Sequence, residues 1–139
     1  LGRHCWYTLT DGPDLSVFPP EAGFGLLAYD PDPLDATPAA EKEAYRALAT
    51  LISIAGDSRY AADRRDELGL DADQYAFALA GPRGRITVLW AHGKDAHTSL
   101  WLGAGPGAAL CDLFGACRWV QASALVALDE APQYLVEPR

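Results

Sequence analysis

The sequence predicts a mainly β protein, an antiparallel β-sandwich preceded by a short strand-loop-helix segment. Three observations lead to this prediction: a hairpin pattern over residues 73–91, short strand patterns at regular intervals after it, and a single amphipathic helix pattern before it. We therefore divide the chain into a strand-loop-helix segment, residues 1–57, and a β-sandwich domain, residues 58–139.

The hairpin is the clearest predicted element. Large apolar residues alternate with other residues on both sides of Gly81-Pro82-Arg83-Gly84, namely Tyr75, Phe77, Leu79, Ile86, Val88 and Trp90. A period of two places these side chains on one face of two paired strands, and the Gly-Pro sequence between them is typical of a chain reversal. A hairpin alone is marginally stable in water, so we expect further strands or a second layer to cover this face.

Short strands are predicted along most of the remaining chain. Two apolar runs, 5–10 and 24–29, lie between loops rich in Pro and Asp, and residues 58–68 fit an exposed edge strand because charged residues at 63–67 discourage pairing with other chains. Five runs follow the hairpin, at 97–102, 108–113, 118–121, 125–128 and 133–136. Turns containing Gly or Pro separate them, which favours a sandwich.

One helix is predicted before the β region. Thr37 suits the N-cap, Pro38 the first helical position, and Glu41 and Glu43 the positive end of the helix dipole, while Gly56 supplies a stop. Apolar residues recur at helical spacing on one face: Ala44, Tyr45, Leu48, Leu51, Ile52 and Ala55. We expect this stripe to pack on a neighbouring surface or on a second copy of the chain, which makes a homo-oligomer through the helix face one expectation.

Composition excludes two classes of partner. The net charge of −8 provides no basic surface for a phosphate backbone, so we expect no nucleic acid. No apolar run approaches the roughly 20 residues needed to cross a bilayer, so we expect no membrane association. The chain starts at Leu1 and contains no Met, which favours a piece of a longer protein, and the sequence assigns it no cellular location.

The three cysteines do not form a complete disulfide framework, because one must stay unpaired within the chain. Cys111 and Cys117 would face each other across a hairpin with a three-residue loop, 113–115, and would lie on opposite faces with a two-residue loop, 114–115. Because the loop length is ambiguous, the pattern favours small buried thiols over a disulfide.

Catalytic and metal motifs are not predicted. His92, Asp95 and His97 lie together in a polar loop, which is the usual place for such residues without a metal. The glycine-rich run 103–107 lacks the Lys-Ser or Lys-Thr ending of a phosphate loop, and no serine lies in a Gly-x-Ser-x-Gly sequence. We therefore expect no metal, no cofactor and no catalytic residue.

The four tryptophans are the most informative candidates. Exposed indoles stack on the apolar faces of sugar rings, whereas buried indoles belong to a core. Trp90 shares a face with Ile86 and Val88 and is expected in the core. Trp101 and Trp119 are predicted as a carbohydrate-binding pair, and Trp6, at the end of the first apolar run, is a third candidate.

The order of these motifs resembles the C-terminal region of (β/α)₈-barrel glycoside hydrolases. Residues 5–56 are similar to the last strand and helix of such a barrel, through the sequences WYTLTDG, GLLAYD and EAYRALATL. Residues 58–137 are similar to the small β-sandwich that follows it, through YAFALAG, ITVLWA, LCDLFGA and ALVALDEAPQYLVEP. The chain departs from the family at Lys42-Glu43, where Lys-Pro is usual, which puts the subfamily in doubt.

The resemblance implies a part of a retaining glycoside hydrolase that is inactive alone. The two catalytic carboxylates of such enzymes come from the fourth and seventh barrel strands, which would precede Leu1. Trp6 would then match the aromatic residue on the final strand that floors the sugar site. Our first hypothesis is a non-catalytic sandwich region that stabilises the remainder of the catalytic barrel, its partner. The alternatives are a carbohydrate-binding module and a protein-interaction domain.

Overall fold

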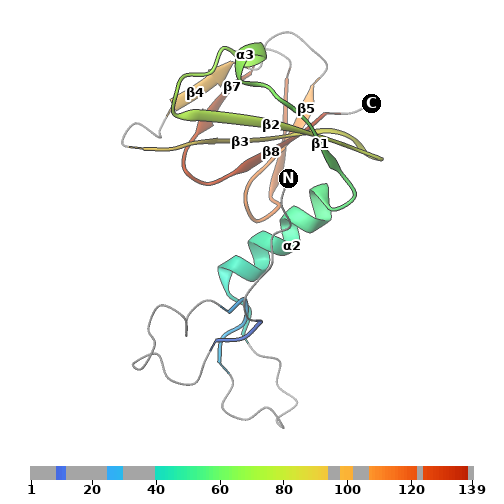
Figure 1. The fold of residues 1–139 in the computed structure, drawn as a ribbon, viewed down its shortest axis with the longest axis vertical. Coiled ribbons are helices and arrows are strands. Elements are labelled where there is room, and N and C mark those ends of the chain that lie inside the picture. The colour runs from blue at the N-terminus through green and yellow to red at the C-terminus, as the bar shows by residue number, and fades with distance from the viewer. Residues whose placement is uncertain are drawn as a thin grey trace. The chain divides into compact units, whose positions relative to one another are not determined.

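The computed structural model describes residues 9–11, 25–29, 40–93, 98–101, 107–121 and 124–137, with the backbone alone at 98–101. Contacts divide the chain into two compact units, Leu1–Ala49 and Thr50–Arg139. The predicted fold class is confirmed, because the second unit is mainly β and a helix precedes its strands (Figure 1). None of the described helices is long and apolar enough to cross a membrane.

Six strands form one antiparallel sheet. In spatial order they are β1 (Arg59–Asp63), β2 (Gln74–Gly81), β3 (Gly84–Ala91), β8 (Gln133–Glu137), β5 (Ala108–Cys111) and β6 (Cys117–Val120). A second sheet pairs β4 (Thr98–Trp101) with β7 (Leu125–Leu128). The strands expected after residue 58 are all present, and their ends fall within two residues of the predicted ones, except for the first.

The first strand is shorter than predicted. β1 is an edge strand, as its charges suggested, but it ends at Asp63, and α3 (Arg65–Leu68) replaces the rest of the expected strand. Gly69 ends α3 in the left-handed conformation, at φ 61°. The position of α3 brings Leu68 against the core below it.

The predicted hairpin is confirmed in detail. Gly81 pairs with Gly84, so Pro82 and Arg83 form a two-residue turn, and Gly84 adopts φ 124°, which a residue with a side chain rarely does. Tyr75 pairs with Trp90, and the large apolar residues of both strands share one face of the sheet.

The core, however, lies mainly on the other face of the hairpin. Ala76 and Ala78 are 1% and 2% exposed, and Leu89 is fully buried, whereas the aromatic residues of the hairpin remain half-buried. We expected the face with the large residues to be the covered one. The small side chains of β2 instead permit close packing with the second sheet, whose Val126 and Leu128 belong to the same cluster.

The predicted helix begins later than expected. α2 spans Glu43–Ala55, and Gly56 follows its last residue as predicted. Thr37 and Pro38 lie outside the described residues. Glu41 is not helical: it forms an antiparallel bridge with Leu27, which in turn bridges Thr10 in parallel.

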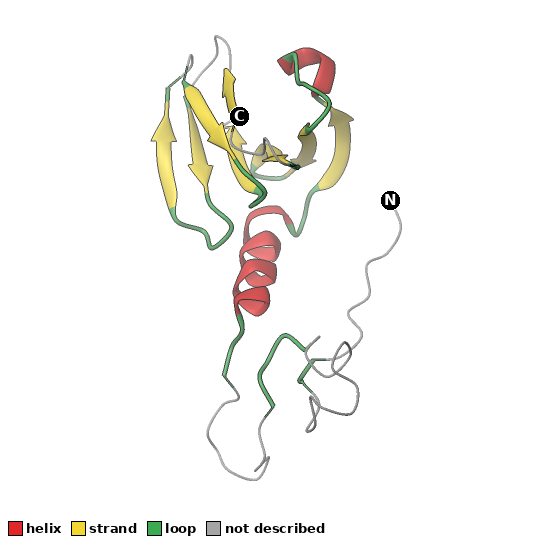
Figure 2. Ribbon diagram, turned by 90° about the vertical axis from the view of Figure 1, so that its left-hand side faces the viewer, coloured by secondary structure: helices red, strands yellow, loops and turns green. Residues whose placement is uncertain are grey.

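The apolar stripe of α2 is also rotated from the predicted one. Ile54 and Ala55 pack on the six-stranded sheet, while Leu51 and Ile52 are 38% and 59% exposed. Figure 2 shows the C-terminal end of α2 next to the strands. The last residues of α2 therefore pack on the six-stranded sheet, whereas the Ile52 side chain is exposed.

In the first unit, the described residues surround one ion pair. The Lys42 ammonium lies 3.0 Å from an Asp11 carboxylate oxygen, which also accepts a hydrogen bond from the Gly25 backbone N–H. Of the predicted strands at 5–10 and 24–29, residues 5–8 and 24 lie outside the described part of the chain.

Candidate functional site

Four aromatic side chains form a cluster on the outer face of β1, β2 and β3, which we call the aromatic patch: Tyr60, Tyr75, Phe77 and Trp90. The rings of Tyr75 and Trp90 are stacked, with centroids 4.9 Å apart and planes 12° apart. Phe77 lies 5.5 Å from Trp90 and 6.3 Å from Tyr60, at tilted angles. The guanidinium of Arg65 lies 5.4 Å from the centre of the Tyr75 ring, within cation–π range.

The end of α2 covers the middle of the same sheet face. Ile54 and Ala55 contact a cluster built from Ile86, Cys111 and Tyr134, which are almost fully buried. The aromatic patch lies beside this contact, and Tyr60 still exposes 46% of its surface. The sheet therefore presents aromatic surface next to a position where it already accepts a helix.

A buried arginine joins three segments behind this surface. Arg64 is 5% exposed; its Nη1 donates to Thr87 Oγ1 at 2.7 Å and to Glu137 Oε2 at 3.1 Å, and its other nitrogens pair with Glu67. Arg85 adds two hydrogen bonds of 2.7 Å to the Glu137 carboxylate. Because every charge in this network has a partner, it is a structural ion-pair network.

The surroundings of Glu67 and Tyr134 move the pKa values of their side chains. Hydrogen bonds from Arg64 hold the pKa of Glu67 below its ordinary value, because they stabilise the ionised carboxylate. Burial raises the pKa of the Tyr134 hydroxyl, because the charged phenolate would lose hydration.

Cys111 and Cys117 form a disulfide, so the expectation of buried free thiols is wrong. The two residues are direct cross-strand partners in β5 and β6, joined by the longer of the two loops that we considered. Asp112 stabilises that loop, since its Oδ1 accepts hydrogen bonds of 2.9 Å from the backbone N–H groups of Phe114 and Ala116. Cys117 is exposed, whereas Cys111 lies in the cluster under α2.

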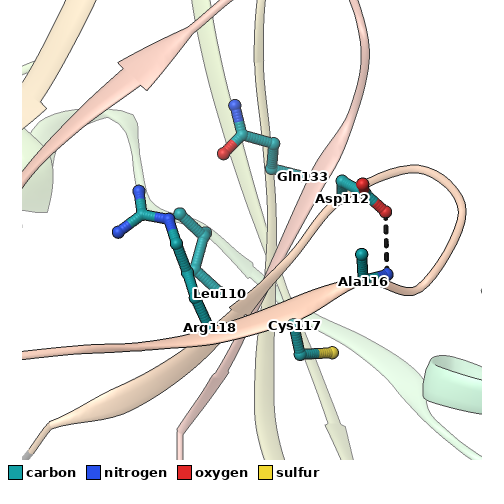
Figure 3. A pocket seen from close by; sticks show the side chains of 6 residues that line it. All are labelled: Leu110, Asp112, Ala116, Cys117, Arg118 and Gln133. Carbon is teal, nitrogen blue, oxygen red and sulfur yellow. Dashed lines mark hydrogen bonds between the residues drawn. The ribbon is translucent and has the colours of Figure 1, made fainter.

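A cavity of about 310 Å³ lies beside this hairpin (Figure 3), lined by Leu110, Asp112, Ala116, Cys117, Arg118 and Gln133. Arg118 and Gln133 extend on one side of the hairpin, while the Cys117 side chain points to the other. Two of the polar groups already serve the fold, because Asp112 holds the turn and Gln133 Nε2 donates to the Ala127 carbonyl at 2.8 Å. The cavity therefore offers little polar chemistry to a ligand beyond the Arg118 guanidinium.

The structure places the backbones of two predicted carbohydrate-binding residues on different sheets. Trp119 lies on β6 of the large sheet and is 66% exposed, while the Trp101 backbone belongs to β4 of the small sheet. The Trp101 side chain and all of Trp6 lie outside what the structure describes. Trp90 shares the face of Ile86 and Val88 as predicted, but it is half-buried in the aromatic patch.

No group of three potential metal ligands occurs among the described residues. Of the polar loop at 92–97, His92 is described: its imidazole is 74% exposed and lies 3.8 Å from Glu130. Asp95 and His97 lie outside the described residues, as does His4.

Sequence reasoning missed Gly107, the residue that supports Trp119. A Cβ atom at Gly107 would lie only 2.5 Å from Cζ2 of the indole, so the ring rests against the glycine backbone. The signal in the sequence was a glycine immediately before a strand, which is equally typical of an ordinary turn.

Comparisons with known proteins do not identify the chain: no protein-family model matches it, no curated protein is significantly similar, and no solved structure matches it.

Proposed function

We propose that residues 58–139 form the non-catalytic β-domain of a barrel-type glycoside hydrolase, which stabilises the catalytic barrel by packing against it. The observation that carries this proposal is the aromatic patch beside the end of α2. Aromatic residues dominate the energetics of protein interfaces, and a surface patch of this kind is typical of a docking site.

The helix contact indicates the kind of partner. Ile54 and Ala55 already pack a helix against Ile86 and Tyr134, at the middle of the sheet face. Leu51 and Ile52 are exposed on the side of that helix. A second helix lying beside α2 would cover these residues and the aromatic patch together. The outer layer of a (β/α)₈ barrel consists of such helices, in agreement with the resemblance of residues 5–56 to its last unit.

The experiment uses the protein extended by about 300 residues of upstream coding sequence, the usual scale of a barrel. We expect the extended protein to hydrolyse aryl glycosides and residues 1–139 alone to show no turnover. Tyr60→Ser should lower the temperature at which the extended enzyme inactivates, while its initial rate stays unchanged. Leu125→Ser, at another exposed apolar position, on the other sheet, is the matched control.

Three outcomes would overturn the proposal: turnover by residues 1–139 alone, an upstream sequence that forms no barrel, or identical inactivation of the Tyr60 and Leu125 variants. Thermal unfolding of both variants within residues 1–139 verifies that neither change damages the β-domain itself. A dimer that depends on Leu51 and Ile52, seen by analytical ultracentrifugation of the extended protein, would assign the helix face to a second copy instead.

A further inference from the structure

The indole of Trp119 is an exposed flat surface at the edge of the large sheet. β6 is the last strand of that sheet, and Trp119 exposes 66% of its surface, more than any other described large apolar residue. Its cross-strand neighbour on β5 is Ala109, whose side chain is too small to cover an indole. One face of the ring is therefore open to a ligand.

The opposite side of the ring is supported by the backbone. The nearest atoms to a Cβ built on Gly107 are indole atoms, Cζ2 at 2.5 Å and Cε2 and Nε1 at 2.7 Å. Any side chain at position 107 would therefore displace the ring. A ring held in this way loses little conformational freedom when a ligand stacks on it, which favours binding.

The described neighbours of the ring on β5 and along β6 are small or polar. On the same sheet face lie Ala109 and the disulfide of Cys117, and Gln121, two residues further along the chain, is exposed. Aromatic residues at the centre of a protein interface are usually enclosed by other well-packed groups. A lone ring with an amide nearby suits a ligand that has one apolar face and hydroxyl groups around its rim.

We propose that Trp119, supported by Gly107, is a stacking site for a neutral pyranose ring of an oligosaccharide. The axial C–H groups of a pyranose present an apolar face to the indole, and the equatorial hydroxyls remain at the rim, within reach of water and Gln121. A nucleobase would offer a similar flat face, but the net charge of −8 opposes the phosphates attached to it. This site lies on β6, at the opposite edge of the sheet from β1, so it goes beyond the proposed docking function.

The test is a titration of residues 1–139 with cellohexaose, xylohexaose and laminarihexaose, followed by intrinsic fluorescence and calorimetry. We expect a saturable signal with at least one of these sugars. Trp119→Ala should weaken that binding at least about tenfold, and Trp119→Phe by less, because it retains a smaller ring. Gly107→Ala should weaken the binding several-fold, because the added methyl group displaces the indole without removing it. Phe114→Ala, which removes an exposed aromatic ring from the same hairpin, is the control and should bind as the parent chain does.

Absence of saturation with all three sugars up to about 10 mM would overturn the site, since weaker binding carries under about 3 kcal/mol. Equal binding by Trp119→Ala would overturn it as well. Binding of a single-stranded oligonucleotide with the same dependence on Trp119 would replace sugar stacking by base stacking. None of these results bears on the docking proposal, whose test depends on Tyr60 at the other edge of the sheet.

Discussion

Arg64 shows how a single residue can tie three segments together. It follows β1 directly, yet its guanidinium reaches Thr87 on β3 and Glu137 on β8, and it pairs with Glu67 in α3. A buried guanidinium that loses its partners destabilises the folded state. Buried partners that lose their guanidinium destabilise it as well. One side chain at the end of β1 therefore links this strand to β3, β8 and α3.

We predict that Arg64→Met lowers the free energy of unfolding by about 3 kcal/mol, because Thr87 and Glu137 lose a charged partner in a buried setting. Urea denaturation followed by circular dichroism measures the change. Arg83→Met, at the exposed turn between β2 and β3, is the matched control and should change the stability by less than about 0.5 kcal/mol. Equal effects of both variants would contradict this role of Arg64.

Glu67 makes the stability depend on pH. Hydrogen bonds from Arg64 hold its pKa in the folded chain below the ordinary value, so its contribution to stability is complete above that ordinary value and is lost as the pH falls through the lower folded pKa. Glu67→Gln should therefore flatten the decline in melting temperature as the pH falls below the ordinary pKa of a glutamate. Because the side chain is 53% exposed, we expect a small effect, and a decline identical to that of the parent chain would exclude it.

At the scale of elements, the strands could be predicted well and the helix less so. Strand ends coincide with Gly, Pro and Asp residues, whose backbone preferences are local, as at Gly81-Pro82-Arg83-Gly84. The start of α2 is decided by a distant segment: the Lys42 backbone N–H donates to the Leu26 carbonyl, and Ala28 donates to Ala40. A pairing of this kind holds residues 40–42 outside the helix, and it cannot be predicted from the local sequence.

The hairpin of β5 and β6 is the element with a covalent crosslink. Its disulfide closes a short loop, for which the loss of entropy in the unfolded chain amounts to about 2 kcal/mol. Reduction of the purified chain should therefore lower its melting temperature by about 5 °C.

Differential scanning calorimetry with and without a reductant measures this shift. A variant with Cys5→Ser is the matched control, since Cys5 has no place in the crosslink and its removal should leave the shift unchanged. An unchanged melting temperature after verified reduction of Cys111 and Cys117 would show that the crosslink does not stabilise the folded state.

At the scale of the whole molecule, the fold class could be predicted but the buried face of the large sheet could not. Apolar residues lie on both faces of the central hairpin, large ones on one face and mainly alanines on the other. The alternation alone therefore does not predict which face packs against the second sheet. Ala76, a small residue on β2, belongs to the same buried cluster as Val126 and Leu128 of the small sheet, while Tyr75 and Phe77 lie on the opposite face. The contact of the Trp119 ring with Gly107 could not be predicted either, because the two residues lie twelve positions apart in the sequence.

The two described core clusters contain residues between Ile54 and Val136, so the folding of the β-domain should not depend on the first 42 residues. We predict that residues 43–139 unfold in one cooperative transition, with a melting temperature within about 3 °C of that of the complete chain. Calorimetry of both proteins tests this. Loss of the cooperative transition would mean that the first unit contributes to the core of the second.

The crosslink between Cys111 and Cys117 has a consequence for which side chains lie on each face of β6. Shifting that strand by one residue would exchange the sides on which Arg118 and Trp119 emerge, sending a charge outward in place of an indole. Oxidation of this one pair of sulfur atoms is compatible with a single alignment of the two strands. The disulfide thus favours the alignment in which Trp119 lies on the same sheet face as Ala109, Cys111 and Cys117.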